Sequence, residues 1–94
     1  MKIAEINANS RKISINGTIS EKGEARNVNT RYGQTRVADA VIEDDSGTMK
    51  LVLWGDEVDN VKLKDNVKIE NGYVKEWNGE VQLSVGKYGK LTVL

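Results

Sequence analysis

The sequence predicts an all-β fold, a small five-stranded barrel with a short helix between the third and fourth strands. Short runs rich in β-branched residues alternate between apolar and polar positions along much of the chain. Nine glycines and no prolines are spread among these runs, which is typical of strands joined by turns and bulges. The pattern contains no repeated alternation of strands with long helices, so a doubly wound α/β fold is disfavoured. Short strands without an internal repeat favour a closed barrel over an open sheet.

Length and composition exclude several classes of protein. The chain has 94 residues, and we expect residues 1–94 to form a single domain. It contains no cysteine and no histidine, which excludes disulfides, thiolate or imidazole metal sites, and Cys–His or Ser–His–Asp catalysis. We therefore expect no cofactor, no metal and no enzymatic activity. No apolar run approaches the ~20 residues that span a bilayer, so we expect a cytoplasmic protein with no membrane partner.

Charge is balanced over the whole chain but not along it. Residues 1–42 carry seven basic and four acidic side chains, and residues 61–94 carry six basic and four acidic ones. The segment 43–60 between them carries one basic and six acidic side chains. A nucleic-acid site would therefore require a locally basic face from which the acidic segment is turned away.

The first strand is expected to start near Ile13. Ile13, Ile15 and Ile19 share one face, and Gly17 between them indicates a bulge or a tight bend. Residues 21–34 are polar and lack a long apolar pattern, so they are interpreted as the end of this strand followed by a flexible loop.

A hairpin is expected next. Strands 35–43 and 48–54 flank Asp44-Asp45-Ser46-Gly47, whose carboxylates can accept hydrogen bonds from backbone N–H groups and whose glycine can close the turn. The strand 35–43 has apolar residues at both parities, so alternation does not assign its faces. In the second strand Met49, Leu51 and Leu53 are expected to face the core, which places Lys50, Val52 and Trp54 outside.

The second half of the chain is expected to contain a short helix and two or three strands. Residues 56–62 can form one or two helical turns, with Asp56 as the N-cap or a first-turn anion.

The strand expected at residues 67–77 is interrupted by Asn71-Gly72. A bulge at Gly72 would return Val74 to the core and turn Tyr73, Lys75 and Trp77 outward. Asn78-Gly79 predicts a hairpin of type I′ character, followed by a strand with Val81, Leu83 and Val85 inside and Gln82 and Ser84 outside. Residues 86–94 are expected to be a last short strand or a tail.

Two segments together resemble a known family. The run from Ala25 to Gly55, with its DDSG turn and its strand ending in Trp-Gly, is followed by VKIENGYVKEWNGEVQLSVG. In order and spacing these segments resemble archaeal single-stranded-DNA-binding proteins and, more broadly, the OB-fold domains of replication protein A. The resemblance implies a five-stranded OB-fold Greek-key barrel with a short helix between strands 3 and 4.

The resemblance also implies a set of binding residues. Bases are expected to stack on Trp54, Tyr73 and Trp77. Arg26 and Arg31 would contribute basic contacts from the loop after the first strand, and Gln82 a polar contact from the fifth.

Physical chemistry supports the same surface independently of the resemblance. A single strand offers a π-face on every base and a charge on every phosphate, so a non-specific binder needs aromatic platforms beside cations. Lys50 and Lys75 lie beside these aromatics, and they are the expected phosphate partners together with Arg31 and Arg36.

We therefore expect a module that binds single-stranded DNA largely without sequence specificity in DNA replication, recombination and repair. Replication or repair proteins are the expected protein partners, and the chain is expected to be a monomer or a weak oligomer. An alternative is an OB-fold protein-interaction or RNA-binding module. A lone tryptophan at a strand end is more often a packing residue than a platform, and only the grouping with Tyr73 and Trp77 favours the binding role. Turn and helix-cap roles are favoured over a metal site for the acidic residues, because they lack the spacing of a calcium loop.

Overall fold

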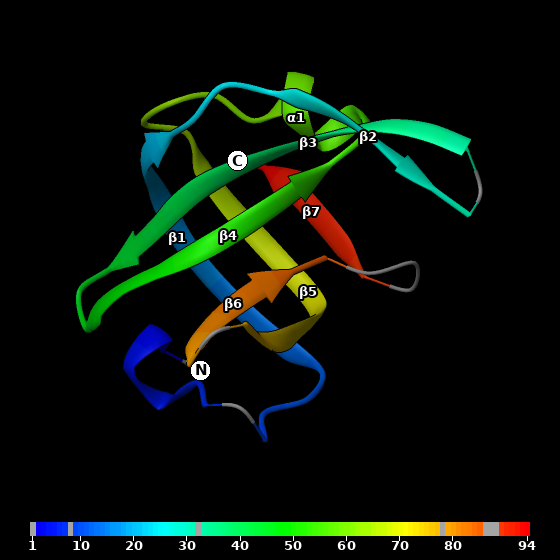
Figure 1. The fold of residues 1–94 in the computed structure, drawn as a ribbon. Helices are drawn as coiled ribbons and strands as arrows, with labels where there is room; N and C mark the ends of the chain where they lie inside the picture. The colour runs from blue at the N-terminus through cyan, green and yellow to red at the C-terminus, as the bar shows by residue number, and fades with distance from the viewer. Residues whose placement is uncertain (1, 8, 32, 78, 86–88) are drawn as a thin grey trace.

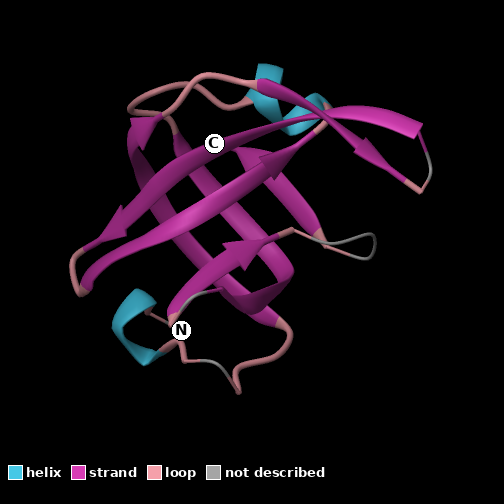
Figure 2. Cartoon of the chain, viewed as in Figure 1, coloured by secondary structure: helices cyan, strands magenta, loops and turns pink. Residues whose placement is uncertain are grey.

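The computed structural model describes residues 2–7, 9–31, 33–77, 79–85 and 89–94, except for the side chain of Trp77. A 3-10 helix, η1 (Ile3–Glu5), precedes strands β1 (Ile13–Lys22), β2 (Arg26–Thr30), β3 (Gly33–Asp44) and β4 (Gly47–Trp54). Helix α1 (Asp56–Asn60) and strands β5 (Asn66–Trp77), β6 (Glu80–Ser84) and β7 (Lys90–Val93) follow. Strands make up most of the described chain (Figure 2).

Five of the strands close into a ring. Neighbouring strands pair in the order β1-β3-β4-β6-β5, and β5 pairs back with β1 (Figure 1). The β4–β6 pair is parallel, whereas the other pairs of the ring are antiparallel. Helix α1 lies between the third and fourth ring strands in chain order. This confirms the expected five-stranded barrel with its inserted helix.

The core fills the inside of this ring. Each ring strand contributes apolar side chains from one face, and η1 and α1 add Ile3 and Val58 at opposite ends of the barrel (Figure 1). The largest fully buried side chains are Ile13, Ile19, Ile42, Leu51, Leu53, Ile69, Leu83, Val61 and Val67. Leu51 and Leu53 are both 0% exposed, as their parity predicted. The opposite parity of each strand is thereby left for the outer surface.

Strand β1 changes partner at its middle. It pairs with β5 from Ile13 to Thr18 and with β3 from Thr18 onward. A Cβ atom on Gly17 would lie 2.6 Å from Cγ1 of Ile42 and 2.8 Å from the carbonyl oxygen of Glu43, so the backbones approach too closely for a side chain. Of the two alternatives expected at Gly17, a bulge or a tight bend, the bulge is wrong, because the register there is continuous. The register shifts instead on either side, at residues 13–15 and 19–21.

Residues 21–34 were expected to complete the first strand and then to form a flexible loop; β1 does end at Lys22, but the expectation of a loop after it is wrong. These residues contain β2, which pairs with the first part of β3 from Arg26 opposite Val37 to Thr30 opposite Gly33. This β2–β3 hairpin projects beyond the barrel (Figure 1). Its strand β2 is exposed except for the half-buried Val28, so it carries no apolar alternation that sequence analysis could detect.

Strand β5 contains the predicted bulge. Ile15 pairs with Ile69, but Ile13 pairs with Gly72, which leaves one extra residue on β5. Asn71 in this interval has a φ of 53°. Beyond the bulge Val74 packs against the core and Tyr73 is 43% exposed, as predicted. The final residues also form a strand, because β7 pairs with the first part of β5.

Asp44 in the β3–β4 turn makes hydrogen bonds both within the turn and to the N-terminal segment. Asp44 accepts hydrogen bonds from the N–H groups of Ser46 (2.7 Å) and Gly47 (3.2 Å), which confirms the predicted turn. It also accepts from the N–H of Ile3 (2.8 Å), and thereby fixes η1. Burial raises the pKa of Asp44, but these hydrogen bonds and one from the hydroxyl of Ser46 outweigh it and lower the pKa to about 2.

Candidate nucleic-acid interface

Strand register brings the outer side chains of three strands onto one face. Across β4, β6 and β5, Lys50 is paired with Gln82, which is paired in turn with Lys75. In the adjacent row Val52 is paired with Ser84, and Ser84 with Tyr73. Side chains of one parity point to the same side of a sheet. The outward positions of β4, β5 and β6 therefore form a continuous surface.

The β2–β3 hairpin turns this surface into a groove. Residues of β2 and β3 form one wall, and the outer face of β4, β6 and β5 forms the floor and the other wall. The hollow measures about 500 Å³, which is within the usual range for ligand sites. We refer to it as the groove; its lining residues are Arg26, Val28, Asn29, Thr30, Val37, Asp39, Lys50, Val52, Trp54, Tyr73, Lys75, Gln82 and Ser84.

Among the side chains that the structure describes, two aromatic ones are exposed in the groove. Trp54 is 40% exposed and Tyr73 is 43% exposed, both as predicted from their parity. Few other large apolar residues are exposed to solvent in the described part of the chain. Aromatic side chains that are exposed in a hollow are the groups on which bases stack in proteins that bind single strands.

The end of β4 is fixed where Trp54 enters the groove. The backbone N–H of Trp54 donates to Oε1 of Glu57 in α1 at 3.1 Å. Burial raises the pKa of Glu57, and this hydrogen bond partly opposes the rise. Gly55 follows with a φ of 59°, a conformation that glycine adopts readily, and the chain then enters α1. The backbone of Trp54 is thus fixed by the pairing of β4 with β3 and by the hydrogen bond to Glu57 of α1.

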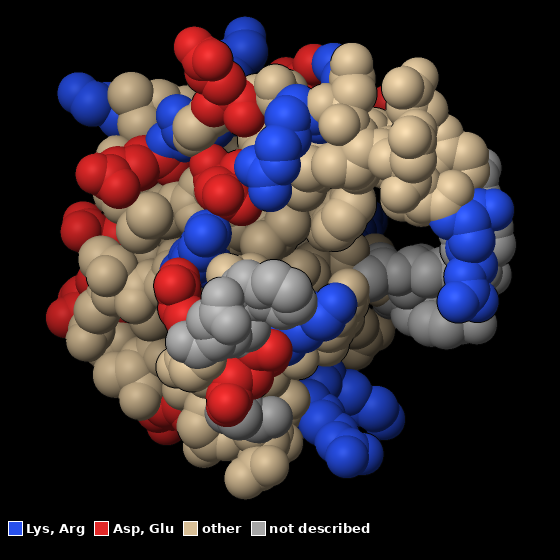
Figure 3. Space-filling view, viewed as in Figure 1, with Lys and Arg blue, Asp and Glu red and all other residues tan. Residues whose placement is uncertain are grey.

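The charges of the groove are predominantly basic. Its lining residues include three cations, Arg26, Lys50 and Lys75, and one carboxylate, Asp39. Nζ of Lys50 lies 3.5 Å from Oδ2 of Asp39, and Nη1 of Arg26 lies 3.7 Å from the same oxygen. On the face that Figure 3 shows, blue basic and red acidic side chains both occur and are not gathered into one strip. The groove is therefore a local basic site on a molecule without net charge.

Three predicted site residues are not brought into the described groove. The guanidinium of Arg36 binds the carboxylate of Asp59 in α1 through two hydrogen bonds, one of 2.9 Å, and Arg36 is not part of the groove lining. This pairing raises the pKa of Arg36 and lowers that of Asp59. Arg31 is exposed in the turn at the tip of the hairpin, outside the groove lining. Trp77 ends β5 opposite Glu80, and its side chain lies outside the described residues.

Sequence analysis missed the residues that the projecting hairpin and β3 supply. Val28, Asn29 and Thr30 were assigned to a loop, and Asp39 lies in a strand whose two faces could not be told apart. The segment Asn27-Val28-Asn29-Thr30 has a single apolar residue, so no apolar stripe marks β2. The one available signal was the exposed parity of Asp39 between Val37 and Val41, which sequence alone could not assign to the groove.

The arrangement is suited to binding and not to covalent chemistry. It combines half-exposed aromatic side chains, cations and hydrogen-bonding side chains, which are the groups that hold bases and phosphates. Within the described ranges no group of three or more acidic residues is placed to hold a metal ion. None of the helices described is long and apolar enough to cross a membrane.

Comparison with known proteins gives a family match over nearly the whole chain. Residues 6–93 match a family described as single-stranded DNA binding protein Ssb-like, OB fold. The single-stranded DNA binding protein Ssb of Saccharolobus solfataricus is 31% identical over 90 residues, which are 96% of this chain. These residues span 61% of the length of that relative.

Solved structures show the same fold. The OB domain of Ta0387 from Thermoplasma acidophilum superposes with a TM-score of 0.86 and 23% identity, covering 100% of this chain and 85% of that one. The second OB-fold domain of replication protein A from Methanococcus maripaludis gives a TM-score of 0.80 with 23% identity, covering 100% of this chain and 93% of the domain. The ring of β1, β3, β4, β6 and β5 is therefore an OB fold.

Proposed function

Because the chain belongs to the Ssb-like family of single-stranded-DNA-binding proteins with an OB fold, we propose that it binds single-stranded DNA in the groove. The family consists of DNA-binding proteins rather than enzymes, in agreement with the sequence analysis. The observation that carries the proposal is the presence of two half-exposed aromatics, Trp54 and Tyr73, in one hollow with three cations. A π-face beside a cation matches the repeating base and phosphate of a single strand.

In the proposed mechanism base stacking supplies most of the affinity. Bases stack on Trp54, on Tyr73 and, as the outward parity of β5 favours, on Trp77. Each stacked base contributes roughly 1–3 kcal/mol. Because every base has a π-face, this binding is largely independent of sequence.

Cations and polar groups along the groove hold the backbone of the strand. Lys75 takes part in no ion pair that the structure describes, so it is the proposed principal phosphate contact. Arg26 and Lys50 contribute more weakly because both lie close to Asp39.

The other predicted contacts have different roles. Gln82 supplies hydrogen bonds, and Arg31 would meet the DNA strand only where the DNA extends past the tip of the hairpin. Arg36 is left out of the proposed contacts because it is engaged by Asp59.

The proposed cellular setting follows from this activity. Replication, recombination and repair all expose single strands, and a structural neighbour is named as a domain of replication protein A. We propose that the chain acts there as one binding module in the cytoplasm, as a monomer or weak oligomer, with replication or repair proteins as its partners.

Tryptophan fluorescence tests the proposal directly. The chain has two tryptophans, so the Trp77→Phe variant retains an aromatic platform and reports on Trp54 alone. Titration with an oligomer of deoxythymidine should quench the emission of this variant and saturate, since a stacked base quenches the indole. Duplex DNA of equal length is the control and should quench much less.

Two results would argue against single-stranded DNA as the ligand. Absence of quenching, together with absence of binding to a fluorescently labelled oligomer, would contradict the proposal. Tighter binding of a uridine oligoribonucleotide in competition with its deoxy counterpart would indicate an RNA-binding module instead.

A further inference from the structure

The groove contains one carboxylate, and non-specific binding of a polyanion does not account for it. Asp39 lies on β3 opposite Val52 of β4, within the lining of the groove. Its side chain is 40% exposed, so its oxygens are open to a ligand in the groove. A carboxylate only accepts hydrogen bonds and repels phosphate. A ligand group that meets Asp39 must therefore be a hydrogen-bond donor; along a deoxyribose strand the N–H groups of the bases are such donors, whereas phosphates are not.

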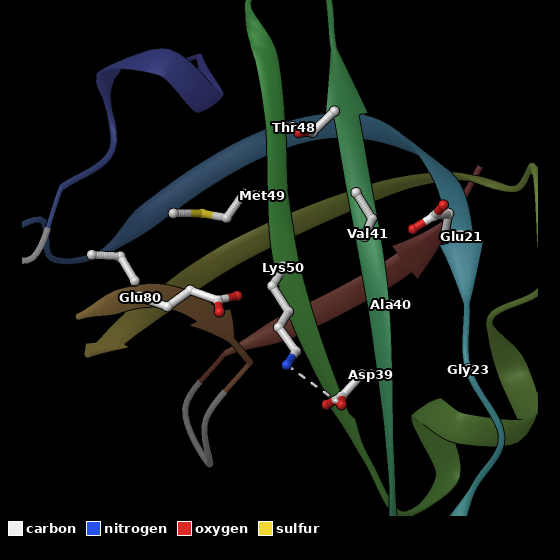
Figure 4. Close-up of a pocket in the computed structure, with 10 residues that line it drawn as sticks. Glu21, Gly23, Asp39, Ala40, Val41, Thr48, Met49, Lys50 and Glu80 are labelled. Atoms are coloured by element: carbon white, nitrogen blue, oxygen red, sulfur yellow. Dashed lines mark ion pairs between the residues drawn. The ribbon is translucent and has the colours of Figure 1, made fainter. Parts of the chain in front are cut away.

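One oxygen of Asp39 is free to accept from a ligand. The shortest contact of each cation with this carboxylate, from Lys50 and from Arg26, is to Oδ2, at 3.5 and 3.7 Å. No hydrogen bond that the structure describes engages Oδ1. Figure 4 shows the ammonium group of Lys50 directed from β4 toward the carboxylate on β3. The two cations thus hold the carboxylate in place from one side without occupying both of its oxygens.

A neighbouring hollow keeps the phosphates to the other side of the groove. Asp39 and Lys50 also line a second hollow, whose other charged residues are Glu21 and Glu80 (Figure 4). With three carboxylates and one cation, this second hollow is unfavourable for a phosphate. Among the described cations that line the groove, Lys75 is the one that no ion pair engages, and it belongs to β5, which β4 and β6 separate from β3. The backbone of a bound strand is therefore favoured along β5, with base edges directed toward β3.

We propose that Asp39 gives the groove a preference among bases, in favour of those that present an amino group on the exposed edge. Cytosine offers its N4 amino group to the free oxygen of Asp39, a contact that acidic side chains make with this base. Uracil and thymine carry an oxygen at the same position, and their single ring N–H lies between two carbonyl oxygens that a carboxylate repels. The inference rests on the proposed function, since it assumes that bases enter the groove.

The test compares two oligomers whose bases differ only on the edge that would meet Asp39, where cytosine has an amino group and an acceptor ring nitrogen and uracil has a carbonyl oxygen and a ring N–H. Oligodeoxycytidine and oligodeoxyuridine of equal length have pyrimidines of the same size, and at mildly alkaline pH cytosine is not protonated at N3. The wild-type chain should bind the cytidine oligomer roughly three- to tenfold more tightly, as expected for one hydrogen bond to a charged acceptor at a partly exposed site. Affinities are measured by polarisation of labelled oligomers at fixed salt.

Two variants of Asp39 show whether this residue is the cause. Asp39→Ala removes the acceptor and should make the two affinities equal. Asp39→Asn retains the shape but adds an amide donor that can reach O4 of uracil, so it should remove or invert the preference. Asp45→Asn makes the same change of charge in the exposed β3–β4 turn and should preserve the wild-type ratio.

The outcomes separate the inference from the function on which it rests. Equal binding of the two oligomers by the wild-type chain would overturn the inference and leave single-strand binding intact. A cytidine preference that survives in both Asp39 variants would overturn it as well. Failure of the wild-type chain to bind either oligomer would contradict the proposed function itself.

Discussion

At the scale of single residues, strand β4 divides its side chains between two tasks. Leu51 and Leu53 are fully buried, whereas Lys50, Val52 and Trp54 line the groove. The alternation along β4 predicted this division because one face of the strand is uniformly apolar.

The groove residue of β3, Asp39, could not be assigned to the outer face from the sequence. The neighbouring Ala38 and Ala40 are as compatible with an outer face as Val37 and Val41.

Substitutions at adjacent positions of β4 should separate binding from stability. Trp54→Ala removes a stacking platform and should weaken binding of oligodeoxythymidine by ~1–3 kcal/mol with little change in the free energy of unfolding. Leu53→Ala leaves a cavity and should cost roughly 2–5 kcal/mol of unfolding free energy. Binding titration and urea unfolding of both variants check this. Unfolding of the Trp54→Ala variant would instead assign the indole to the core.

Protonation of Asp44 should make the free energy of unfolding depend on pH in the acid range. The pKa of Asp44 is about 2 in the folded chain, below the ordinary value of 3.8, because its hydrogen bonds favour the ionised form. The folded state is thus stabilised above about pH 4, and this stabilisation is lost as the pH falls toward about 2. Asp44→Asn should lower the unfolding free energy by about 1–2 kcal/mol at neutral pH. This difference in unfolding free energy between the variant and the wild type should shrink as the pH falls from about 4 to about 2.

Thermal unfolding across this pH range measures the effect. Asp45→Asn, in the same turn but exposed, is the control and should not change the shape of the pH profile. A gap between wild type and Asp44→Asn that stays constant down to about pH 2 would contradict the assigned role of the Asp44 carboxylate.

At the scale of the elements, success in predicting each strand followed the strength of its apolar pattern. The bulge of β5 was predictable because Ile69 and Val74 are out of phase and Asn71-Gly72 lies between them. Strand β2 was not predictable, since it is stabilised by pairing with β3 outside the core and has a polar sequence. The orientation of Arg36 depends on its contact with Asp59 in α1, a contact between segments 23 residues apart that no local pattern indicates.

Strand β1 should be sensitive to any side chain at Gly17. In Gly17→Ala the added methyl group would overlap Ile42 and the backbone of Glu43, which requires the β1–β3 pair to separate. We expect a loss of about 1–3 kcal/mol in unfolding free energy, as for overpacked sites. Ser14→Ala, at an exposed position of the same strand, should change it by less than ~0.5 kcal/mol. Equal unfolding midpoints for the two variants would show that β1 and β3 are not in close contact there.

At the scale of the whole molecule, binding is expected to depend on stacking more than on charge. The chain has no net charge, and the groove offers three cations against one carboxylate. The order of strands, turns and helix could be predicted from the sequence because it is local information, whereas the Greek-key arrangement of the barrel was implied by the family resemblance. The composition of the groove could not be predicted, since it depends on how the β2–β3 hairpin lies over β4, β5 and β6.

The salt dependence of binding should therefore be shallow. Each phosphate contact on a single strand contributes about 0.7 to the slope of log affinity against log salt, so three groove cations predict a magnitude of about 2 or less. Lys75→Gln should reduce that magnitude by about 0.7, whereas the control Arg36→Gln should leave it unchanged. A slope typical of a strongly basic protein, or equal effects of the two variants, would contradict the assigned contacts.

The central claim is that single-stranded DNA occupies the groove, and mapping of backbone amide shifts by NMR during titration with oligodeoxythymidine tests it most directly. The account predicts shifts at groove positions such as Val52, Trp54, Tyr73 and Gln82, and little change at η1 or the β3–β4 turn. Shifts concentrated on β7 or at η1, with the groove amides unchanged, would contradict it.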